Sequence, residues 1–297
     1  MSKLVLKLPS FLNDKEKDFR KLFDLWHQVE ITEGDVDFDF SKCYFLRPNA
    51  VAFLGGIARM VESSGRKATF NWDSLSSPAV RTNLSQNGFA GTFGHPITGW
   101  EGNSIPYRED HSLDMNAIMD YLTYKWLGKG WILISERLRD AIAGRMWEIY
   151  NNAFEHSGSK IGVFSCGQHF KKKNELILTV IDFGRGIPEN VKTFFGKYAD
   201  AGSVSKLSGA ACLKWAFERG NSTITDIVAR GLGLDLLKEF VRLNQGKLEV
   251  YSNDAYALIN TEGDNFVKKD VSFDGTIMHL TLRCDERLYS FKDEAVG

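Results

Sequence analysis

The amino-acid sequence predicts an α/β protein made of two units joined by an elbow. Segments with the alternation of half-buried strands take turns with segments of helical periodicity, first over residues 3–89 and again over 112–282. Between them lies FGHPITGWEGNSIP (93–106), which is rich in glycine and proline and has no periodicity. We therefore expect a first domain, a linker and a second domain over 1–95, 96–106 and 107–297.

The first domain alternates strands with helices. In its first helix the apolar residues recur at the spacing of one buried face: Phe19, Leu22, Phe23 and Trp26. Gly65 and Gly88 follow the two later helices and are suited to end them. The expected elements, in chain order, are a strand over 3–8, a helix over 14–29, a strand over 35–40, a helix over 49–65, a strand over 67–72 and a short helix over 77–88.

The second domain begins with two helices. We expect Ser112 to cap the first, because its hydroxyl can accept a hydrogen bond from the first turn. The basic run KKK (171–173) is typical of an exposed turn between strands, and residues 185–229 are too irregular to assign. The expected elements are helices over 112–127 and 134–157, strands over 160–167 and 176–184, a helix over 231–246, and strands over 247–253 and 275–282.

Composition and charge exclude several classes of function. The 297 residues carry a formal net charge of −1 at pH 7, which gives no overall attraction to nucleic acid or to an anionic membrane. No stretch of about 18 apolar residues is present, and the N-terminus turns charged at once, unlike a secretory signal. The four cysteines are scattered, so neither zinc nor disulfides are expected and a reducing cytoplasm is the predicted location.

A polar stripe on the helix predicted over 134–157 is the first candidate for a site of chemistry. In EIYNNAFEHS, Glu148, Asn152 and His156 follow one another at intervals of four and so share one face of a helix that is otherwise largely apolar. Such stripes usually face water. A glutamate and an asparagine one turn apart also suit a carboxylate that activates a nucleophile beside an oxygen ligand to Mg²⁺.

Two glycine-containing turns are the other candidates. In VIDFGRGIP an apolar strand delivers Asp182 to a turn with Gly184 and Gly186, where the backbone can approach a flat ligand. In ARGLGLDLL, Gly231 and Gly233 precede a helix whose unpaired N–H groups suit phosphate. Each turn alone is more often structural, and only their order and spacing together favour a binding site.

Together these stretches resemble the GHKL ATP-binding domain, shared by gyrase, heat-shock chaperone, histidine kinase and MutL ATPases. The resemblance covers roughly residues 105–284, with a long variable segment where that superfamily has its ATP lid. Other nucleotide folds fit poorly, since GxxxxGK[ST] is absent and Leu236 stands where GxGxxG needs its third glycine. The matching motifs, in the order of the superfamily, are Glu148-x3-Asn152, Asp182-x-Gly184-x-Gly186, Gly231-x-Gly233 and Gly275–Thr276.

The resemblance implies a role for each matching residue. Asn152 would be the ligand to Mg²⁺ that bridges to the phosphates, and Glu148 the base for an attacking water or hydroxyl. Asp182 would accept a hydrogen bond from the adenine amino group, with Thr276 supporting it. The implied cofactors are ATP and Mg²⁺, and the other residues implied to contact the nucleotide are Gly184, Gly186, Ile187, Arg230, Gly231, Leu232, Gly233 and Leu234.

The remaining polar residues near these motifs have less specific interpretations. We interpret His156 as a contact to the helix dipole rather than to ribose or lid, and its neighbour Asn151 has no assigned role. Only Arg230 is favoured to reach a γ-phosphate, because it adjoins Gly231. The other basic residues of the lid are interpreted as solvated: Lys206, Lys214 and Arg219.

Residues 35–89 resemble a STAS domain, the fold of sulfate transporters and anti-sigma-factor antagonists. The order of strand, loop, helix, strand and helix agrees, without a diagnostic motif. Regulated STAS domains carry a phosphoacceptor Ser or Thr at the start of the helix after FL, where this sequence reads RPNAVAF with Asn49. The resemblance therefore implies a fixed docking or dimerisation surface.

Three functions remain open. The first is a regulatory Mg·ATP-binding protein, a slow ATPase whose nucleotide state controls docking of a protein partner or a second copy through the N-terminal domain and the lid. The second is a serine/threonine kinase of anti-sigma-factor type acting on a partner in trans. The third is a non-hydrolysing ATP-dependent switch. A sensor histidine kinase is disfavoured, because residues 101–133 contain only His111 and no paired-helix module.

Overall fold

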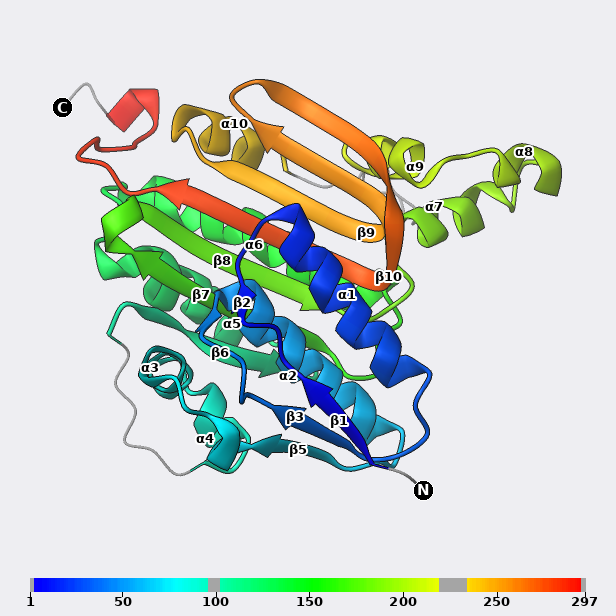
Figure 1. The fold of residues 1–297 in the computed structure, drawn as a ribbon. Coiled ribbons are helices and arrows are strands. Elements are labelled where there is room, and N and C mark those ends of the chain that lie inside the picture. Colours follow the sequence, from blue (N-terminus) through cyan, green and yellow to red (C-terminus); the bar gives the residue numbers. More distant parts are fainter. Residues whose placement is uncertain (1–2, 96–101, 219–233, 295–297) are drawn as a thin grey trace. The chain divides into compact units, whose positions relative to one another are not determined.

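A computed structural model describes residues 3–95, 102–218 and 234–294 of the chain (Figure 1). The fold is α/β, as the sequence predicts. None of the helices in these ranges is both long and apolar enough to cross a membrane. The chain separates into two compact units, each drawn from distant segments: Met1–His111, Lys160–Gln168 and Leu178–Ile181 in one, and Ser112–Ser159, His169–Ile177 and Asp182–Gly297 in the other.

The first unit contains a parallel sheet with the strand order β1 (Leu4–Lys7), β3 (Val36–Asp39) and β5 (Ala68–Asn71). Parallel neighbours need crossover connections. The helices of these crossovers are α1 (Glu16–Glu30) and α2 (Pro48–Ser63). The predicted alternation of strands and helices is confirmed here. A second, shorter parallel pair joins β2 (Phe11–Leu12) to β4 (Phe45–Leu46).

The core of this unit forms where the sequence places it. The α1 residues that were predicted to point inward are each at most 7 % exposed: Phe19, Leu22, Phe23 and Trp26. Helix α2 is buried on nearly every side, because it packs against both α1 and β5. On the sheet, the rings of Phe38 and Phe70 stack with their centroids 4.4 Å apart.

Strand β6 (Ser104–Asp110) also belongs to the first unit and pairs antiparallel with β7 (Val163–Phe170). Its first residues fall within the predicted linker 96–106, of which 96–101 lie outside the described residues. A strand begins there although the stretch around Pro106 shows no periodicity. Between β5 and β6 the chain forms the helices α3 (Pro78–Gln86) and α4 (Phe89–Thr92).

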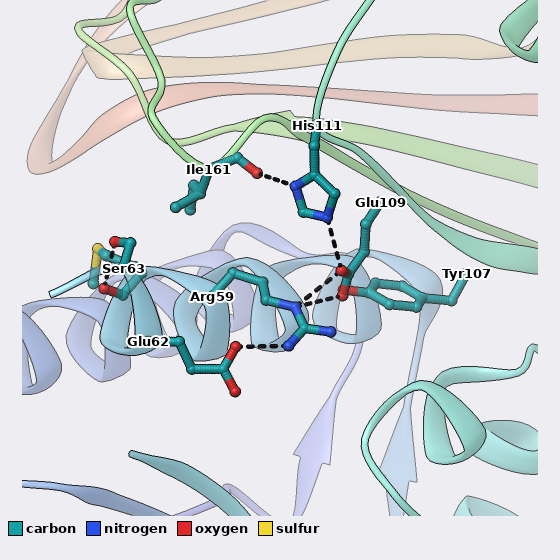
Figure 2. A network of polar contacts seen from close by, with 8 residues as sticks. Arg59, Glu62, Ser63, Tyr107, Glu109, His111 and Ile161 are labelled. Atoms are coloured by element: carbon teal, nitrogen blue, oxygen red, sulfur yellow. Dashed lines mark hydrogen bonds and ion pairs between the residues drawn. The ribbon is translucent and has the colours of Figure 1, made fainter. Parts of the chain in front are cut away.

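A polar network within the first unit joins α2 to β6 (Figure 2). The Nε atom of Arg59 lies 3.1 and 2.9 Å from the two carboxylate oxygens of Glu109, and Nη1 donates to Glu62 at 2.6 Å. Tyr107 donates its hydroxyl to Glu109 at 2.7 Å. The Nε2 atom of His111 lies 3.4 Å from the same carboxylate. Glu109, whose side chain is 11 % exposed, is therefore the centre of the network.

The second unit begins with α5 (Met115–Asp120), which continues as a π-helical stretch over Tyr121–Trp126. Asp114 caps α5, since its carboxylate accepts a hydrogen bond from the Ala117 N–H at 3.0 Å. The prediction that Ser112 caps this helix is therefore wrong. The chain runs on without helical structure for two residues beyond Ser112, and a carboxylate caps as well as a hydroxyl.

Helix α6 (Glu136–His156) confirms the helix predicted over 134–157. The hydroxyl of Ser135 accepts a hydrogen bond from the Leu138 N–H and caps its first turn. In the second unit α6 packs against α5 and against α10 (Asp235–Leu243), which in turn packs on β9.

The larger sheet has the strand order β6-β7-β8-β10-β9. A short helical turn at Lys171–Lys173 precedes β8 (Glu175–Asp182) and confirms the predicted basic turn. The strands β9 (Lys247–Asn260) and β10 (Gly263–Arg283) form an antiparallel hairpin much longer than predicted. Register shifts between Lys268 and Thr276 interrupt the alternation, which explains why the sequence showed only the regular ends.

Three short helices occupy part of the region that the sequence left unassigned, namely α7 (Ile187–Phe195), α8 (Ala201–Ser205) and α9 (Gly209–Ala216). None has more than 9 residues, too few for a repeated apolar pattern. Local signals start each of them: Pro188 lies in the first turn of α7, and the side chains of Asp200 and Ser208 cap α8 and α9.

Candidate functional site

Helix α6 carries the predicted polar stripe beside its buried face. Glu148, Asn152 and His156 are each half-buried, so the stripe is partly shielded from water. Glu148 forms an ion pair with Arg145, three residues earlier, at 2.5 Å. The residues that α6 buries completely are apolar apart from one hydroxyl: Leu138, Ile142, Ala143, Met146, Ile149 and Tyr150.

His156 is the last residue of α6. Burial lowers its pKa, and the nearby Glu155 acts in the opposite direction with a smaller effect. A favourable contact with the helix dipole requires the charged imidazolium, which burial disfavours. The neighbouring Asn151 is half-buried as well.

Asp182 ends β8 in a group of hydrogen-bond donors. It is only 5 % exposed, and the Gly184 N–H donates to Oδ1 at 3.0 Å. The hydroxyl groups of Thr276 and Ser157 and the Thr276 N–H also favour the charged carboxylate and act to lower its pKa. Burial nevertheless raises the pKa of Asp182 to about 7, because desolvation of the charged form outweighs these hydrogen bonds.

Three glycines let the backbone close around this carboxylate. A Cβ on Gly184 would lie 2.3 Å from the Ser157 carbonyl oxygen, and one on Gly275 would lie 2.2 Å from the Asp182 carbonyl oxygen. Gly186 has φ of +79°, which favours glycine. The Asp182-x-Gly184-x-Gly186 turn is thus built for close approach, as its sequence predicts.

Strand β9 holds the far end of this turn through Ser252, which is fully buried. The Ile187 N–H donates to the Ser252 hydroxyl oxygen at 2.8 Å. Ser252 itself donates to the Gly275 carbonyl at 3.0 Å, and its Oγ lies 3.0 Å from Thr276 Oγ1. One hydroxyl therefore links the turn to the residue that supports Asp182.

Asn253, the next residue on β9, fixes the middle of the turn. Its Nδ2 donates to the Arg185 carbonyl at 3.0 Å. Its Oδ1 is buried and has no hydrogen-bond partner within the described part of the chain. A Cβ on Gly186 would lie 2.4 Å from that same oxygen, so a glycine is required beneath it.

The second glycine turn is not part of this group, because residues 219–233 lie outside the described ranges. The predicted contacts at 230–233, and Arg219, are among them. Leu234 is described: it is buried and directly precedes α10. Lys206 and Lys214 are both exposed, which agrees with their interpretation as solvated residues.

The structure brings Asp182, Gly184, Ile187 and Thr276 together, and α6 ends against them at Ser157. Asn152 and Glu148 lie five and nine residues before Ser157 on the same helix, about 8 and 14 Å along its axis. A site that recognises a base near Asp182 and carries out chemistry near Glu148 and Asn152 requires such a distance between the two ends. The arrangement suits an elongated ligand such as a nucleoside triphosphate.

Comparison with known families agrees with this geometry. Residues 139–285 match the family described as histidine kinase-, DNA gyrase B- and HSP90-like ATPase. This part of the chain, just under half of its length, is therefore similar to GHKL-type ATPase domains. The matched range contains Glu148, Asn152, Asp182 and Thr276, and it does not reach the segment that resembles a STAS domain. No curated protein matches the chain significantly.

Two features of the matched range bear on whether ATP and Mg²⁺ would fit it. The buried Asp182 carboxylate, beside a turn whose glycines pack closely on neighbouring residues, suits a hydrogen-bond donor on the edge of a flat base. In the described ranges no group of three or more His, Cys, Asp or Glu side chains is arranged to hold a metal ion. Asn152 offers one amide oxygen, and a magnesium ion bound with substrate phosphates keeps several waters and needs few protein ligands.

Sequence reasoning missed Ser157, Ser252 and Asn253. Serine and asparagine are common at helix ends and turns, so none of them stands out by type or spacing. Only Ser157 had a usable signal, since it directly follows the polar stripe in EIYNNAFEHS.

Proposed function

We propose that the GHKL-type domain binds Mg·ATP and hydrolyses it slowly, and that its nucleotide state controls the docking of a protein partner or a second copy. The observation that carries the binding is Asp182, a buried carboxylate at a strand end, followed by a glycine turn that packs closely on neighbouring residues. Burying a carboxylate costs free energy unless hydrogen-bond donors or an opposite charge compensate for the lost water, and a donor on a ligand would contribute to that compensation. An exocyclic amino group is a matching donor, and adenine has one.

Each residue then has a defined task. Asp182 accepts a hydrogen bond from the adenine amino group, while Gly186 lets the backbone approach the ring. Asn152 would hold Mg²⁺, which when bound would supply charge that stabilises the phosphates. Glu148 orients and deprotonates the attacking water, after its carboxylate exchanges the ion pair with Arg145 for a hydrogen bond to that water. Residues 231–233, which lie outside the described ranges, are proposed from the sequence alone to contact the phosphates.

The N-terminal unit is proposed to be the docking surface, with a STAS-like fold. Asn49 stands where regulated STAS domains carry a phosphoacceptor hydroxyl, and it is completely buried. Its Nδ2 donates to the Asn13 carbonyl at 2.9 Å, so this position contributes to the core rather than to a modifiable surface. A fixed docking surface is consistent with both observations. The four cysteines are all free thiols, consistent with the cytoplasm as the proposed location.

The test compares nucleotide binding and ATP turnover in the wild type and in Glu148→Ala and Asp182→Asn. Glu155→Ala is the matched control, because Glu155 is an exposed glutamate on the same helix. Removing a positioned base costs on the order of 10²–10⁴-fold in rate. We therefore expect Glu148→Ala to bind ATP and lose turnover, Asp182→Asn to bind ATP measurably but more weakly, and the control to behave as the wild type.

The outcomes distinguish the three functions. Turnover that depends on Glu148 without any partner identifies an ATPase. ATP binding with no turnover, and with phosphate appearing on a serine or threonine only after a partner is added, identifies a kinase acting in trans. Binding that never leads to phosphate release or transfer identifies a switch. A wild type that does not bind ATP overturns the proposal.

A further inference from the structure

Ser157 uses all its polar groups where α6 meets the Asp182 turn. Its N–H donates to the Ala153 carbonyl at 3.1 Å and closes the last turn of the helix. Its carbonyl oxygen accepts from the Arg185 N–H at 2.8 Å. Its hydroxyl lies near enough to Asp182 to favour the charged carboxylate and lower its pKa. One residue, 5 % exposed, thus joins the helix to both the side chain and the backbone of the turn.

The hydroxyl oxygen of Ser157 also accepts a hydrogen bond. The Ser159 N–H donates to its oxygen at 3.0 Å, which leaves the hydroxyl proton free to point at Asp182. Gly184 packs so closely against Ser157 that no Cβ fits between them. A shift of the turn relative to the end of α6 would therefore break several hydrogen bonds of Ser157.

The donors to Asp182 come from three sources. Gly184 belongs to the turn itself, Thr276 belongs to β10, and Ser157 belongs to α6. Of these, only Ser157 lies on the segment that also carries Asn152 and Glu148. A displacement of the Asp182 carboxylate is thus transmitted to α6 through this hydroxyl more directly than through the other two.

We propose that Ser157 is a positioning residue that couples recognition of the adenine amino group to the helix carrying Glu148 and Asn152. This inference rests on the proposed function. The serine touches neither the nucleotide nor the reacting atoms. It holds Asp182 in place for the base and keeps the end of α6 in a fixed position beside Asp182. A correctly bound base therefore also aligns the side chains of Glu148 and Asn152.

The experiment measures equilibrium binding of ATP and of purine riboside triphosphate, which lacks only the amino group, together with kcat and KM for ATP. The variants are Ser157→Ala, Asp182→Asn and the double variant. Ser157→Thr restores the hydroxyl, and Ser159→Ala removes a hydroxyl from the same turn while keeping the N–H that donates to Ser157. Thermal melting without nucleotide records stability separately.

We expect the wild type to prefer ATP and Ser157→Ala to lose roughly tenfold of that preference, the size of one lost hydrogen bond to a charged group. Its kcat at saturating ATP falls as well. In the Asp182→Asn background the serine substitution has little further effect on preference, because both residues act through one contact. Ser157→Thr recovers most of the preference, and Ser159→Ala retains it.

Several results would overturn the coupling. A Ser157→Ala protein that melts earlier but keeps its preference for ATP would show a structural role only. Loss of preference with unchanged kcat, or full additivity with Asp182→Asn, would separate the serine from the catalytic helix. In each of these cases the wild type still binds ATP, so the proposed function survives. A wild type that binds neither nucleotide overturns both.

Discussion

The protonation state of Asp182 determines what the base-binding end of the site can accept. Burial raises its pKa to about 7, and the protonated carboxyl has one donor more and fewer acceptors than the carboxylate. Affinity for ATP should therefore fall as the pH drops below this value, by up to about tenfold per pH unit, and stay level above it. Calorimetric titrations across this range check the profile.

The control for this profile is Asp182→Asn, which has no ionisable group at this position. Whatever pH dependence the variant keeps belongs to the phosphates of the ligand. The difference between the two profiles belongs to Asp182, and its absence would contradict the assignment of this residue to the base.

The same shift has the opposite consequence for the protein without nucleotide. From the ordinary pKa of 3.8 up to about 7, the unfolded chain has released a proton that the folded protein retains. The free energy of unfolding contributed by this group is thus fully present below 3.8 and is lost as the pH rises through 7. Urea unfolding should therefore show Asp182→Asn gaining stability relative to the wild type as the pH rises across this window.

Replacing Gly275 should be costly, because a side chain there would collide with the neighbouring backbone. It has φ of +141°, and a Cβ there would lie 2.2 Å from the Asp182 carbonyl oxygen. Gly263 is a matched control, with φ of +124° and nothing within 4 Å of its Cβ position. Gly275→Ala should cost clearly more unfolding free energy than the order of 1 kcal/mol expected for Gly263→Ala from backbone strain alone. Equal losses in urea unfolding would contradict the close contact.

At this scale the sequence finds residues with a characteristic type and spacing. Asp182 and its glycines form such a pattern, and the structure places Thr276 beside Asp182 as expected. Ser252 and Asn253 escape notice because they act from a strand about 70 residues away in sequence, through hydrogen bonds that only tertiary structure creates. The roles of these residues toward ATP stay predictions.

The attachment of α2 to β6 makes a prediction at the level of elements. Glu109 accepts hydrogen bonds from Arg59 and Tyr107, whereas Glu62 contacts Arg59 from a more exposed position, 38 % against 11 %. Glu109→Gln should therefore lower the free energy of unfolding by about 1–3 kcal/mol, because the part-buried Arg59 guanidinium loses its charged partner on β6 and keeps only the more exposed Glu62. Glu62→Gln should cost less than about 1 kcal/mol. Denaturant unfolding of both variants tests this, and a larger loss for Glu62→Gln would refute the assignment of Glu109 as the centre.

Elements were predictable where the apolar period repeats several times. Helices α1, α2 and α6 have that length, and their predicted ranges are close to those observed. Strand β6 was missed because Pro106 lies within it, which a strand tolerates only where its N–H is not needed, as at the edge of a sheet. The short helices α7 to α9 were missed because one or two turns hold too few residues to show a period.

At the scale of the molecule, the two compact units are not continuous stretches of chain. Lys160–Gln168 and Leu178–Ile181 belong with the N-terminal segment, although they lie inside the range that matches the ATPase family. A change of composition along the sequence can locate only a continuous boundary, such as the linker predicted at 96–106. The pairing of strands far apart in sequence is what defines the units instead.

This organisation predicts how the chain responds to truncation. A chain beginning at residue 112 contains the whole family match but lacks β6, whose residues pair with β7 from Ser104↔Gln168 to Asp110↔Val163. It should aggregate, because the free edge of β7 can pair with another chain and the apolar surface that Ile105 covers becomes exposed. A chain beginning at residue 102 keeps the pairing and should aggregate less. It lacks α2, which packs on β6, and should therefore be less stable than the full chain. Size-exclusion chromatography, circular dichroism and ATP binding compare the three. If the shortest chain proves monomeric, folded and equal to the full chain in ATP affinity, the matched range is an independent domain and β6 is dispensable.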